Sequence, residues 1–341
     1  MNHKILFVDL DATLLSDDKT VSEENRAAIQ KMLLAGHDIV LSTGRPVESG
    51  RAVARELELT QPGCYMIAFN GAVLYDCAAD RVLLKCSLPI EVTQELFERA
   101  SKAGIYAQTY NNTEIITTRH TAELEYYRKK TGLSYKLSAN VLDLLEEEPQ
   151  KVLMIDLKNT GRLARFREKN LEWEKGKCTS FFSCREYLEY CPLDTSKGTG
   201  VSCLTKMLNL PLDCTVAVGD EENDIAMLNA AHIGVAVKNA TPEVKAAADY
   251  VTEHDNNHNA IAEVIERFIL EKEGLLHRAG SCLESIRNII RSTPRRFQLE
   301  MQMEHSFEKN VSISSCWMFA SDSVSLPRLD TSGVCPTSHR Q

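Results

Sequence analysis

Near its start the chain reads Lys4-Ile5-Leu6-Phe7-Val8-Asp9-Leu10-Asp11-Ala12-Thr13-Leu14-Leu15. Residues 5 to 8 are all apolar without polar alternation, which is typical of a strand buried on both faces of a parallel sheet. Two aspartates, Asp9 and Asp11, stand where this strand should end. Alternate residues of an extended chain point to the same side, so both carboxylates are expected to face one pocket. In open α/β sheets, ligands bind at this edge.

The spacing of the two acids suits phosphoryl transfer. One carboxylate can attack phosphorus to form an aspartyl phosphate, while the second protonates the leaving oxygen and then activates water. The alternative is that these side chains only cap a turn, as aspartates often do after a strand. This stretch by itself does not decide between the two readings, so the remaining motifs have to.

Composition and charge narrow the class of protein. A chain of 341 residues allows about two domains and a large core. Hydrophobic content of 43% and charged content of 26% are typical of a soluble globular protein. A net charge of -9 argues against a general nucleic-acid binder and fits acidic metal sites better. The chain shows no signal-peptide pattern and no apolar run of about 18 residues, which predicts a cytoplasmic protein without a membrane partner.

The cysteines indicate the redox compartment. There are eleven, an odd number, and none forms a C-x-x-C pair with zinc-type spacing. We therefore expect small buried hydrophobes in a reducing compartment, with neither a disulfide framework nor a zinc site.

Two further strand ends carry polar residues. An apolar strand over 38–41 leads into Ser42-Thr43-Gly44-Arg45, ahead of a helix expected from Val47. A hydroxyl, a glycine and exposed amides at such a place can cradle a phosphate, although a tight turn uses the same residues. A third strand, over 65–69, ends at Asn70-Gly71 and should continue as a hairpin. For Asn70, turn formation and a polar contact to substrate stay equally open.

Two later stretches add a cation and further acids. Lys197 lies at the expected start of a helix, where the helix dipole disfavours a cation, so an anionic partner is expected; a solvated surface lysine is the alternative. A strand over 215–219 then ends at Asp220. The acids that follow and Asn223 open the next helix, where the dipole favours acids even without a function, which is the alternative for Glu221 and Glu222. Asp220, at the strand tip itself, is therefore the stronger candidate.

The pattern divides the chain into four parts. Residues 1–83 and 190–273 carry the long buried strands of one core. Residues 84–189 show short alternating strands and helices, which predicts a compact α/β module inserted into that core. Residues 274–341 have no sustained period and are expected to form a flexible tail, with one short helix after Ser281. A docking segment for a partner is the alternative for this tail.

Taken together, these strand ends can hold a magnesium ion and a phosphate. Magnesium takes oxygen ligands and commonly one or two carboxylates, which Asp9, Asp220 and a backbone carbonyl would supply. Lys197 and the backbone amides of Thr43 and Gly44 are then expected to hold the equatorial phosphate oxygens.

Four motifs resemble those of the haloacid dehalogenase superfamily, and their order and the size of the insertion resemble its Cof-type phosphatases. They are Asp9-Leu10-Asp11-Ala12-Thr13, Ser42-Thr43-Gly44-Arg45, Lys197 and Gly219-Asp220-Glu221-Glu222-Asn223-Asp224. The resemblance covers about residues 1 to 272 and implies an α/β fold, with a Rossmann-like parallel-sheet core and an inserted α/β cap. It also implies magnesium-dependent hydrolysis of small phosphate esters, sugar phosphates among them, through an aspartyl phosphate.

The resemblance also implies roles for individual residues. Asp9 would be nucleophile and metal ligand, and Asp11 the acid/base, whose backbone carbonyl also binds the metal. Asp220 would complete the metal ligands. The phosphate-binding residues would be Leu10, Thr43, Gly44, Lys197 and Asn223, and the supporting residues Asp224 and Asn70.

Ala12 departs from the pattern, because the family usually has glycine there. If the position needs a positive φ, alanine costs about 1 kcal/mol. Two other functions stay open: a phosphomutase of the same superfamily, and a catalytically silent binding protein that keeps the fold. The expected partner is a small phosphorylated metabolite. Neither the substrate nor the oligomeric state has a diagnostic pattern in the sequence, and a homo-oligomer stays open.

Overall fold

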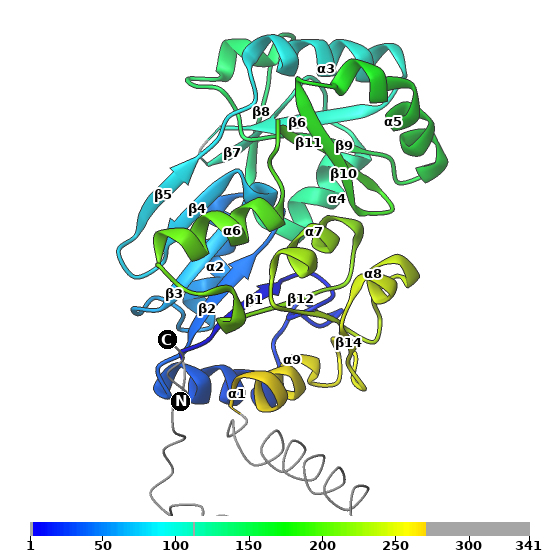
Figure 1. Cartoon of the computed structure of the whole chain (residues 1–341). Helices are drawn as coiled ribbons and strands as arrows, with labels where there is room; N and C mark the ends of the chain where they lie inside the picture. Colours follow the sequence, from blue (N-terminus) through cyan, green and yellow to red (C-terminus); the bar gives the residue numbers. More distant parts are fainter. Residues whose placement is uncertain (1–2, 112, 271–341) are drawn as a thin grey trace, which may run out of the picture. The chain divides into compact units, whose positions relative to one another are not determined.

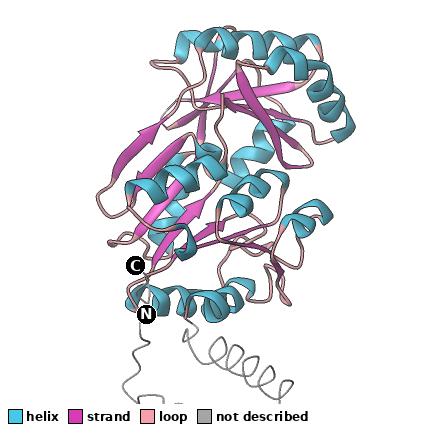
Figure 2. Ribbon diagram, viewed as in Figure 1, coloured by secondary structure: helices cyan, strands magenta, loops and turns pink. Residues whose placement is uncertain are grey.

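The structure, a computed structural model, describes residues 3–111 and 113–270. These residues belong to one compact unit. The flexible tail expected over residues 274–341 lies outside the described residues. The short helix expected after Ser281 therefore also lies outside them. The described chain folds into two β-sheets with helices around them (Figures 1 and 2).

The first sheet has eight strands in the order β14-β13-β12-β1-β2-β3-β4-β5. It is parallel from β14 to β3, and the hairpin strands β4 and β5 are antiparallel. The four apolar residues of β1 are fully buried, as their sequence predicts for a central strand. The strands of this sheet are β1 (Ile5–Asp9), β2 (Asp38–Ser42), β3 (Cys64–Ala68), β4 (Val73–Asp76), β5 (Arg81–Lys85), β12 (Thr215–Gly219), β13 (Ile233–Ala236) and β14 (Tyr250–Val251).

Helices accompany this sheet and begin where the sequence places their caps. The Ser22 side chain accepts the Asn25 amide at the start of the first helix, and Gly36, with φ 84°, follows its end. Helices α1 and α9 lie side by side in Figure 1, as do α6 and α7. The helices are α1 (Glu23–Leu34), α2 (Val47–Glu56), α6 (Lys197–Met207), α7 (Glu222–Ala230), α8 (Pro242–Ala247) and α9 (Ala260–Val264), the last continuing as a π-helical turn (Ile265–Ile269).

The second sheet has six strands in the order β10-β11-β9-β6-β7-β8 and is antiparallel except for the β7–β8 pair. A separate apolar cluster packs it against α3 and α5. Its strands are β6 (Tyr106–Tyr110), β7 (Glu114–Thr117), β8 (Ser134–Leu137), β9 (Val152–Ile155), β10 (Cys178–Cys184) and β11 (Tyr187–Pro192). Its helices are α3 (Ile90–Lys102), α4 (Ala122–Thr131) and α5 (Thr160–Glu174), and short 3-10 turns cover Phe69–Gly71, Val141–Leu144 and Leu212–Cys214.

The α/β fold class is confirmed, and the structure adds detail at both predicted cap boundaries. Strand β5 of the first sheet crosses residue 83, and strand β11 of the second sheet crosses residue 189. No helix among the described residues combines the length and the apolar composition needed to cross a membrane. The eight cysteines among these residues are free thiols; four are buried, as expected for small hydrophobes, and four are partly exposed.

Candidate active site

The polar strand ends meet at one edge of the first sheet. Strands β12, β1 and β2 are adjacent and parallel, so their carboxyl ends lie together. A cavity of about 180 Å³ opens there. Of the site residues predicted from the sequence, Leu10, Lys197 and Asn70 do not line this cavity, whereas the following do: Asp9, Asp11, Thr43, Gly44, Asp220, Asn223 and Asp224, together with Ala12.

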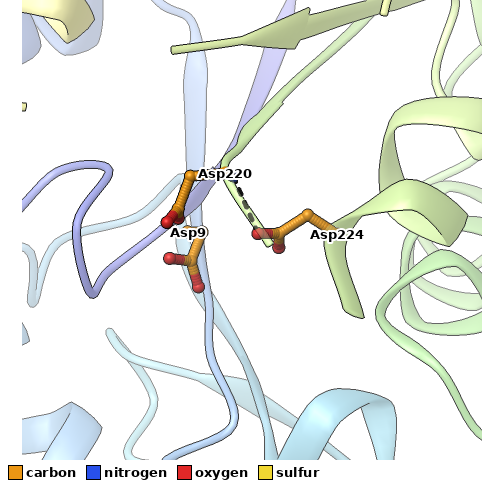
Figure 3. Close-up of side chains that lie close together, drawn as sticks. All are labelled: Asp9, Asp220 and Asp224. Carbon is orange, nitrogen blue, oxygen red and sulfur yellow. Dashed lines mark hydrogen bonds between the residues drawn. The ribbon is translucent and has the colours of Figure 1, made fainter. Parts of the chain in front are cut away.

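Three buried carboxylates form the floor of this site. Asp9, Asp220 and Asp224 offer oxygens that lie within 4.8 Å of one another (Figure 3). Burial raises the pKa of Asp9 to about 7, and burial followed by the charge of Asp9 raises the pKa of Asp220 well above its ordinary value. A dry cluster of like charges is stable only with a cation among them. Three carboxylates are also the hard oxygen ligands that magnesium takes, so the site fits that ion.

Lys197 supplies one positive charge to this cluster. Its ammonium donates to Asp9 Oδ1 at 2.5 Å and to Asp224 Oδ1 at 2.6 Å, and its side chain is 1% exposed. Burial lowers the pKa of Lys197, but the charges of Asp224 and Asp9 raise it more, so the amine stays protonated. The alternative of a solvated surface lysine is therefore wrong, and the anionic partners of Lys197 within the described chain are Asp9 and Asp224.

Asp224 positions the loop that carries Asp220. Its second oxygen accepts the backbone amides of Asp220 at 3.0 Å and Glu221 at 3.1 Å, the first of which is drawn in Figure 3. Gly219 allows this close approach, because a Cβ there would lie 2.4 Å from the Asp224 side chain. Thr13, part of the first motif but given no role in the sequence analysis, donates its hydroxyl to Asp220 Oδ1 at 2.7 Å. Its position two residues after Asp11 is the sequence feature that could have indicated a side chain facing the same site.

The Asp11 carboxylate lies apart from the acidic cluster, held by two cations. Arg45 binds it with Nε and Nη2, both at 2.7 Å, and Lys19 adds a contact at 2.9 Å. Partial burial raises the pKa of Asp11, but the hydrogen bonds and charge of Arg45, then of Lys19, lower it well below its ordinary value. Asp11 is therefore a carboxylate here, and any metal contact from this residue falls to its backbone carbonyl.

The loop after β2 corrects one expectation. The Thr43 amide donates to the Ile67 carbonyl at 2.7 Å as part of the sheet, so it cannot also hold a phosphate. The Thr43 hydroxyl accepts the Arg45 amide at 3.0 Å and keeps its own proton free for another acceptor. The Gly44 amide has no acceptor among the described residues, which leaves it available. Leu10 is fully buried and does not line the cavity, so only its backbone could reach a ligand.

Asn70 combines the two readings that the sequence left open. With φ 55° and ψ 37° it forms the turn after β3. Its side chain is also buried, where Oδ1 accepts from Asn223 at 2.9 Å and Nδ2 donates to Glu189 Oε2 at 2.8 Å. It thus connects Asn223, next to the acidic cluster, to strand β11 of the second sheet.

A buried ion pair from the second sheet completes this wall, and sequence reasoning missed it. Lys151 donates to Glu189 Oε2 at 2.7 Å and to the Gly44 carbonyl at 2.5 Å. Ser183 also donates to Glu189, at 2.5 Å. Lys151 and Glu189 are 38 residues apart and come together only through the pairing of β9 with β11, so no local pattern could reveal them.

A parallel sheet whose strand ends place Asp9 and Asp220 at one cavity, with the buried Lys197 bonded to Asp9, is an arrangement of α/β enzymes that suits phosphoryl transfer. Residues 6–265 match the family model of the haloacid dehalogenase-like hydrolases, and the chain belongs to this family. The expectation of an enzyme of this type is confirmed, and relatives that match it over nearly their whole length are named phosphatases.

Two relatives and one solved structure show the extent of the likeness. The putative phosphatase YxeH of Bacillus subtilis is 30% identical over 276 residues, covering 79% of this chain and 100% of YxeH. The pyridoxal phosphate phosphatase YbhA of Escherichia coli is 27% identical, covering 78% and 98%. A crystal structure of a haloacid dehalogenase-like hydrolase from Bacteroides thetaiotaomicron superposes with a TM-score of 0.71 at 28% identity, covering 78% and 99%.

Proposed function

We propose that this protein hydrolyses small phosphate monoesters with Asp9 as the nucleophile and Mg2+ as cofactor. The observation that carries the proposal is the buried group of Asp9, Asp220 and Asp224 at the cavity, with Lys197 bonded to Asp9. Three anions beside one cation suit a site that binds a divalent ion and an anionic substrate together.

Asp9 would attack the substrate with its unengaged oxygen. Oδ1 is held by Lys197, whereas Oδ2 accepts no hydrogen bond from the described residues. The new bond forms between an Asp9 oxygen and phosphorus while the bond from phosphorus to the leaving oxygen breaks. Lys197, the Thr43 hydroxyl, the Gly44 amide and Asn223 would hold the phosphoryl oxygens during this transfer.

Asp11 would protonate the leaving oxygen and then accept a proton from the water that cleaves the aspartyl phosphate. To carry a proton it must first lose part of its contact with Arg45 and Lys19, which keep it ionised. An incoming phosphate ester offers Arg45 another anion. Substrate binding would thereby raise the pKa of Asp11 toward the range in which it can act as an acid.

Mg2+, when bound, would screen the repulsion between the Asp9 carboxylate and the phosphate. The residues that would hold it are Asp9 and Asp220 through their carboxylates and Asp11 through its backbone carbonyl. Asp224 is occupied by Lys197 and two amides, so it supports these ligands by fixing the Asp220 loop. The carboxylate set favours a hard divalent cation over soft metals.

The inserted module over 84–189 would act as a cap that selects the substrate. Lys151 and Glu189 bring it against Gly44 and Asn70 at the cavity. The motif order and the size of the insertion most resemble the sugar phosphatase YidA, and this resemblance favours sugar phosphates as substrates. The relative YbhA is named for pyridoxal phosphate, another small phosphate ester. The eight free cysteines of the described residues, four of them buried, support a reducing, cytoplasmic location.

The test is hydrolysis of p-nitrophenyl phosphate and of a panel of phosphorylated metabolites by the full chain, with MgCl2 and with EDTA. We expect magnesium-dependent release of inorganic phosphate, abolished in Asp9→Asn. Asp18→Asn, at an exposed residue nearby, is the matched control and should match the unsubstituted protein. Isomerised ester without inorganic phosphate would indicate a phosphomutase. Binding without turnover would indicate a silent binding protein.

A further inference from the structure

The cations that line the cavity differ in what neutralises them. Lys19 and Arg45 pair with Asp11, and Lys151 pairs with Glu189. Lys130 lines the same cavity, yet it forms no ion pair with any carboxylate of residues 3–111 and 113–270. Lys130 is therefore a cation at this cavity that no carboxylate of the described residues holds in an ion pair.

Aromatic rings hold Lys130 in place. It lies in the last turn of α4, and its ammonium is 4.5 Å from the ring centre of Tyr126 and 5.3 Å from that of Tyr187. Ring faces attract a cation, but they carry no net charge. A lysine in the last turn of a helix is also favoured by the helix dipole, without any ligand. The same holds for Lys129, which is exposed and does not line the cavity, so the dipole does not explain why Lys130 lies at the cavity.

Tyr187, on β11, is a second group without a partner. It lines the cavity, is 8% exposed, and its hydroxyl has no hydrogen-bond partner among the described residues. Burial, followed by the nearby Cys184, raises the pKa of Tyr187, so the hydroxyl stays a donor. Buried polar groups are nearly always paired, so a donor left over beside a cavity indicates an acceptor from outside the chain.

We propose that Lys130 and Tyr187 form a subsite for a second acidic group, a carboxylate or a phosphate, on the leaving group of the substrate. This inference rests on the proposed phosphatase function and names its substrate class. A neutral sugar hydroxyl could satisfy the Tyr187 donor, but it would leave the charge of Lys130 uncompensated. An anionic group satisfies both, and charge-assisted hydrogen bonds are about twice as strong as neutral ones.

The test compares matched esters that differ by one acidic group. The pairs are 6-phosphogluconate against glucose 6-phosphate, for a carboxylate, and fructose 1,6-bisphosphate against fructose 6-phosphate, for a phosphate. The full chain is assayed with MgCl2, and p-nitrophenyl phosphate serves as the reference ester. We expect kcat/KM to be about tenfold or more higher for the acidic member of at least one pair, as a charged hydrogen bond provides. The pair that shows the preference identifies the group.

Variants then assign the preference to these two side chains. Lys130→Gln should remove most of it by raising KM for the acidic member, and Lys130→Arg should restore part of it. Tyr187→Phe keeps the ring and should lower kcat/KM for the acidic member several-fold, whereas a hydroxyl with only a structural role would leave it unchanged. Lys129→Gln is the matched control and should leave the preference unaltered.

The outcomes separate this inference from the proposed function. Cleavage of p-nitrophenyl phosphate without preference in either pair overturns the subsite and leaves the phosphatase standing. A preference that survives Lys130→Gln also overturns the subsite. Absence of magnesium-dependent cleavage of every ester in the set overturns both.

Discussion

Four charged side chains meet where β1 and β12 end, and their sum explains why this site suits a divalent ion. When ionised, Asp9, Asp220 and Asp224 contribute three negative charges against the one positive charge of Lys197, and all four side chains are buried. Two negative charges remain in excess, and like charges out of water repel strongly. One Mg2+ would neutralise that excess, which no side chain of the described cluster does.

Metal binding should therefore stabilise the fold in a way that depends on Asp220. We expect MgCl2 to raise Tm by a few degrees, because a ligand at about 100 times its Kd adds about 2.7 kcal/mol. Asp220→Asn keeps an oxygen for the Thr13 hydroxyl, so it should fold, and it should lose most of this rise. The measurement is thermal unfolding with EDTA and with MgCl2. An equal rise in the variant would place the ion elsewhere.

Ala12 should show the cost of its conformation. It has φ 59°, so the positive φ on which the sequence-based cost depended is present. Glycine adopts this region freely, so Ala12→Gly should raise the free energy of unfolding by about 1 kcal/mol. The control is Ala52→Gly on the exposed face of α2, where the same change should lower stability by about 1 kcal/mol. Urea unfolding of both variants checks the opposite signs; a loss at both positions would contradict the argument.

At the scale of elements, the contact of α6 with α7 sets the geometry of Lys197. A Cβ on Gly198 would lie 2.1 Å from the Ala226 carbonyl, so only glycine lets the two helices approach this closely. That approach brings Lys197, the first residue of α6, to Asp224 in the first turn of α7. The capping box between Ser196 and Thr199 fixes where α6 begins.

Gly198→Ala should consequently damage both stability and turnover. Forcing a methyl group into this contact costs about 1–3 kcal/mol, and moving α6 shifts Lys197 away from Asp9. We expect lower kcat in the phosphatase assay together with a lower urea midpoint. Gly161→Ala in α5 is the control. An added Cβ there would have the flexible end of Arg165 as its nearest neighbour, at 3.3 Å, so it fits with little rearrangement. That change should stabilise the protein by up to about 1 kcal/mol.

The start of α5 should give the protein part of its sensitivity to acid. The Asp156 carboxylate accepts the amides of Lys158 and Asn159 and the Arg162 Nε at 2.6 Å. Burial raises the pKa of Asp156, but these hydrogen bonds lower it more, below the unfolded value of about 3.9. A depressed folded pKa gives stability that is present above the unfolded pKa and is lost as pH falls through the folded pKa.

Asp156→Asn should therefore cost about 1–3 kcal/mol at pH 7, and less as the pH falls below about 4. Urea unfolding at pH 7 and at the lowest pH that keeps the protein folded measures the difference. Asp143→Asn provides the comparison, because the Asp143 carboxylate accepts a hydrogen bond from the Asn140 side chain at an exposed turn. A cost for Asp156→Asn that stays constant with pH would show that the carboxylate charge is not involved.

At the scale of the whole molecule, the sequence predicts what is local and misses what the topology brings together. The apolar runs of β1, β2 and β12 are long enough to be recognised as buried strands, and the acids at their ends follow directly. Strand β8 is mostly exposed and β10 is rich in serine and cysteine, so neither shows a clear period. The partners of Asp11 and Asn70 could not be inferred either, because they depend on contacts between distant segments.

The buried pair of Lys151 and Glu189 belongs to the second sheet, and each member also contacts the first sheet's side of the cavity, Lys151 at the Gly44 carbonyl and Glu189 at Asn70. Lys151 neutralises Glu189, whose carboxylate also receives hydrogen bonds from Asn70 and Ser183. Removing one partner of a buried pair leaves an uncompensated charge, which typically costs 3–5 kcal/mol, whereas replacing both is far less costly. The contact between the two sheets should thus be weakened more by one unpaired buried charge than by replacement of both charged residues.

A double-mutant cycle tests this directly. Lys151→Met should lower the free energy of unfolding by about 3 kcal/mol or more, because Glu189 stays charged and buried. Glu189→Gln keeps oxygen and nitrogen atoms for Asn70 and Ser183 but leaves Lys151 unpaired. The double variant carries no buried charge at this position, so its loss should be clearly smaller than the sum of the two single losses. Strict additivity in urea unfolding would show that the two charges do not compensate each other, and that packing alone holds the second sheet against Gly44.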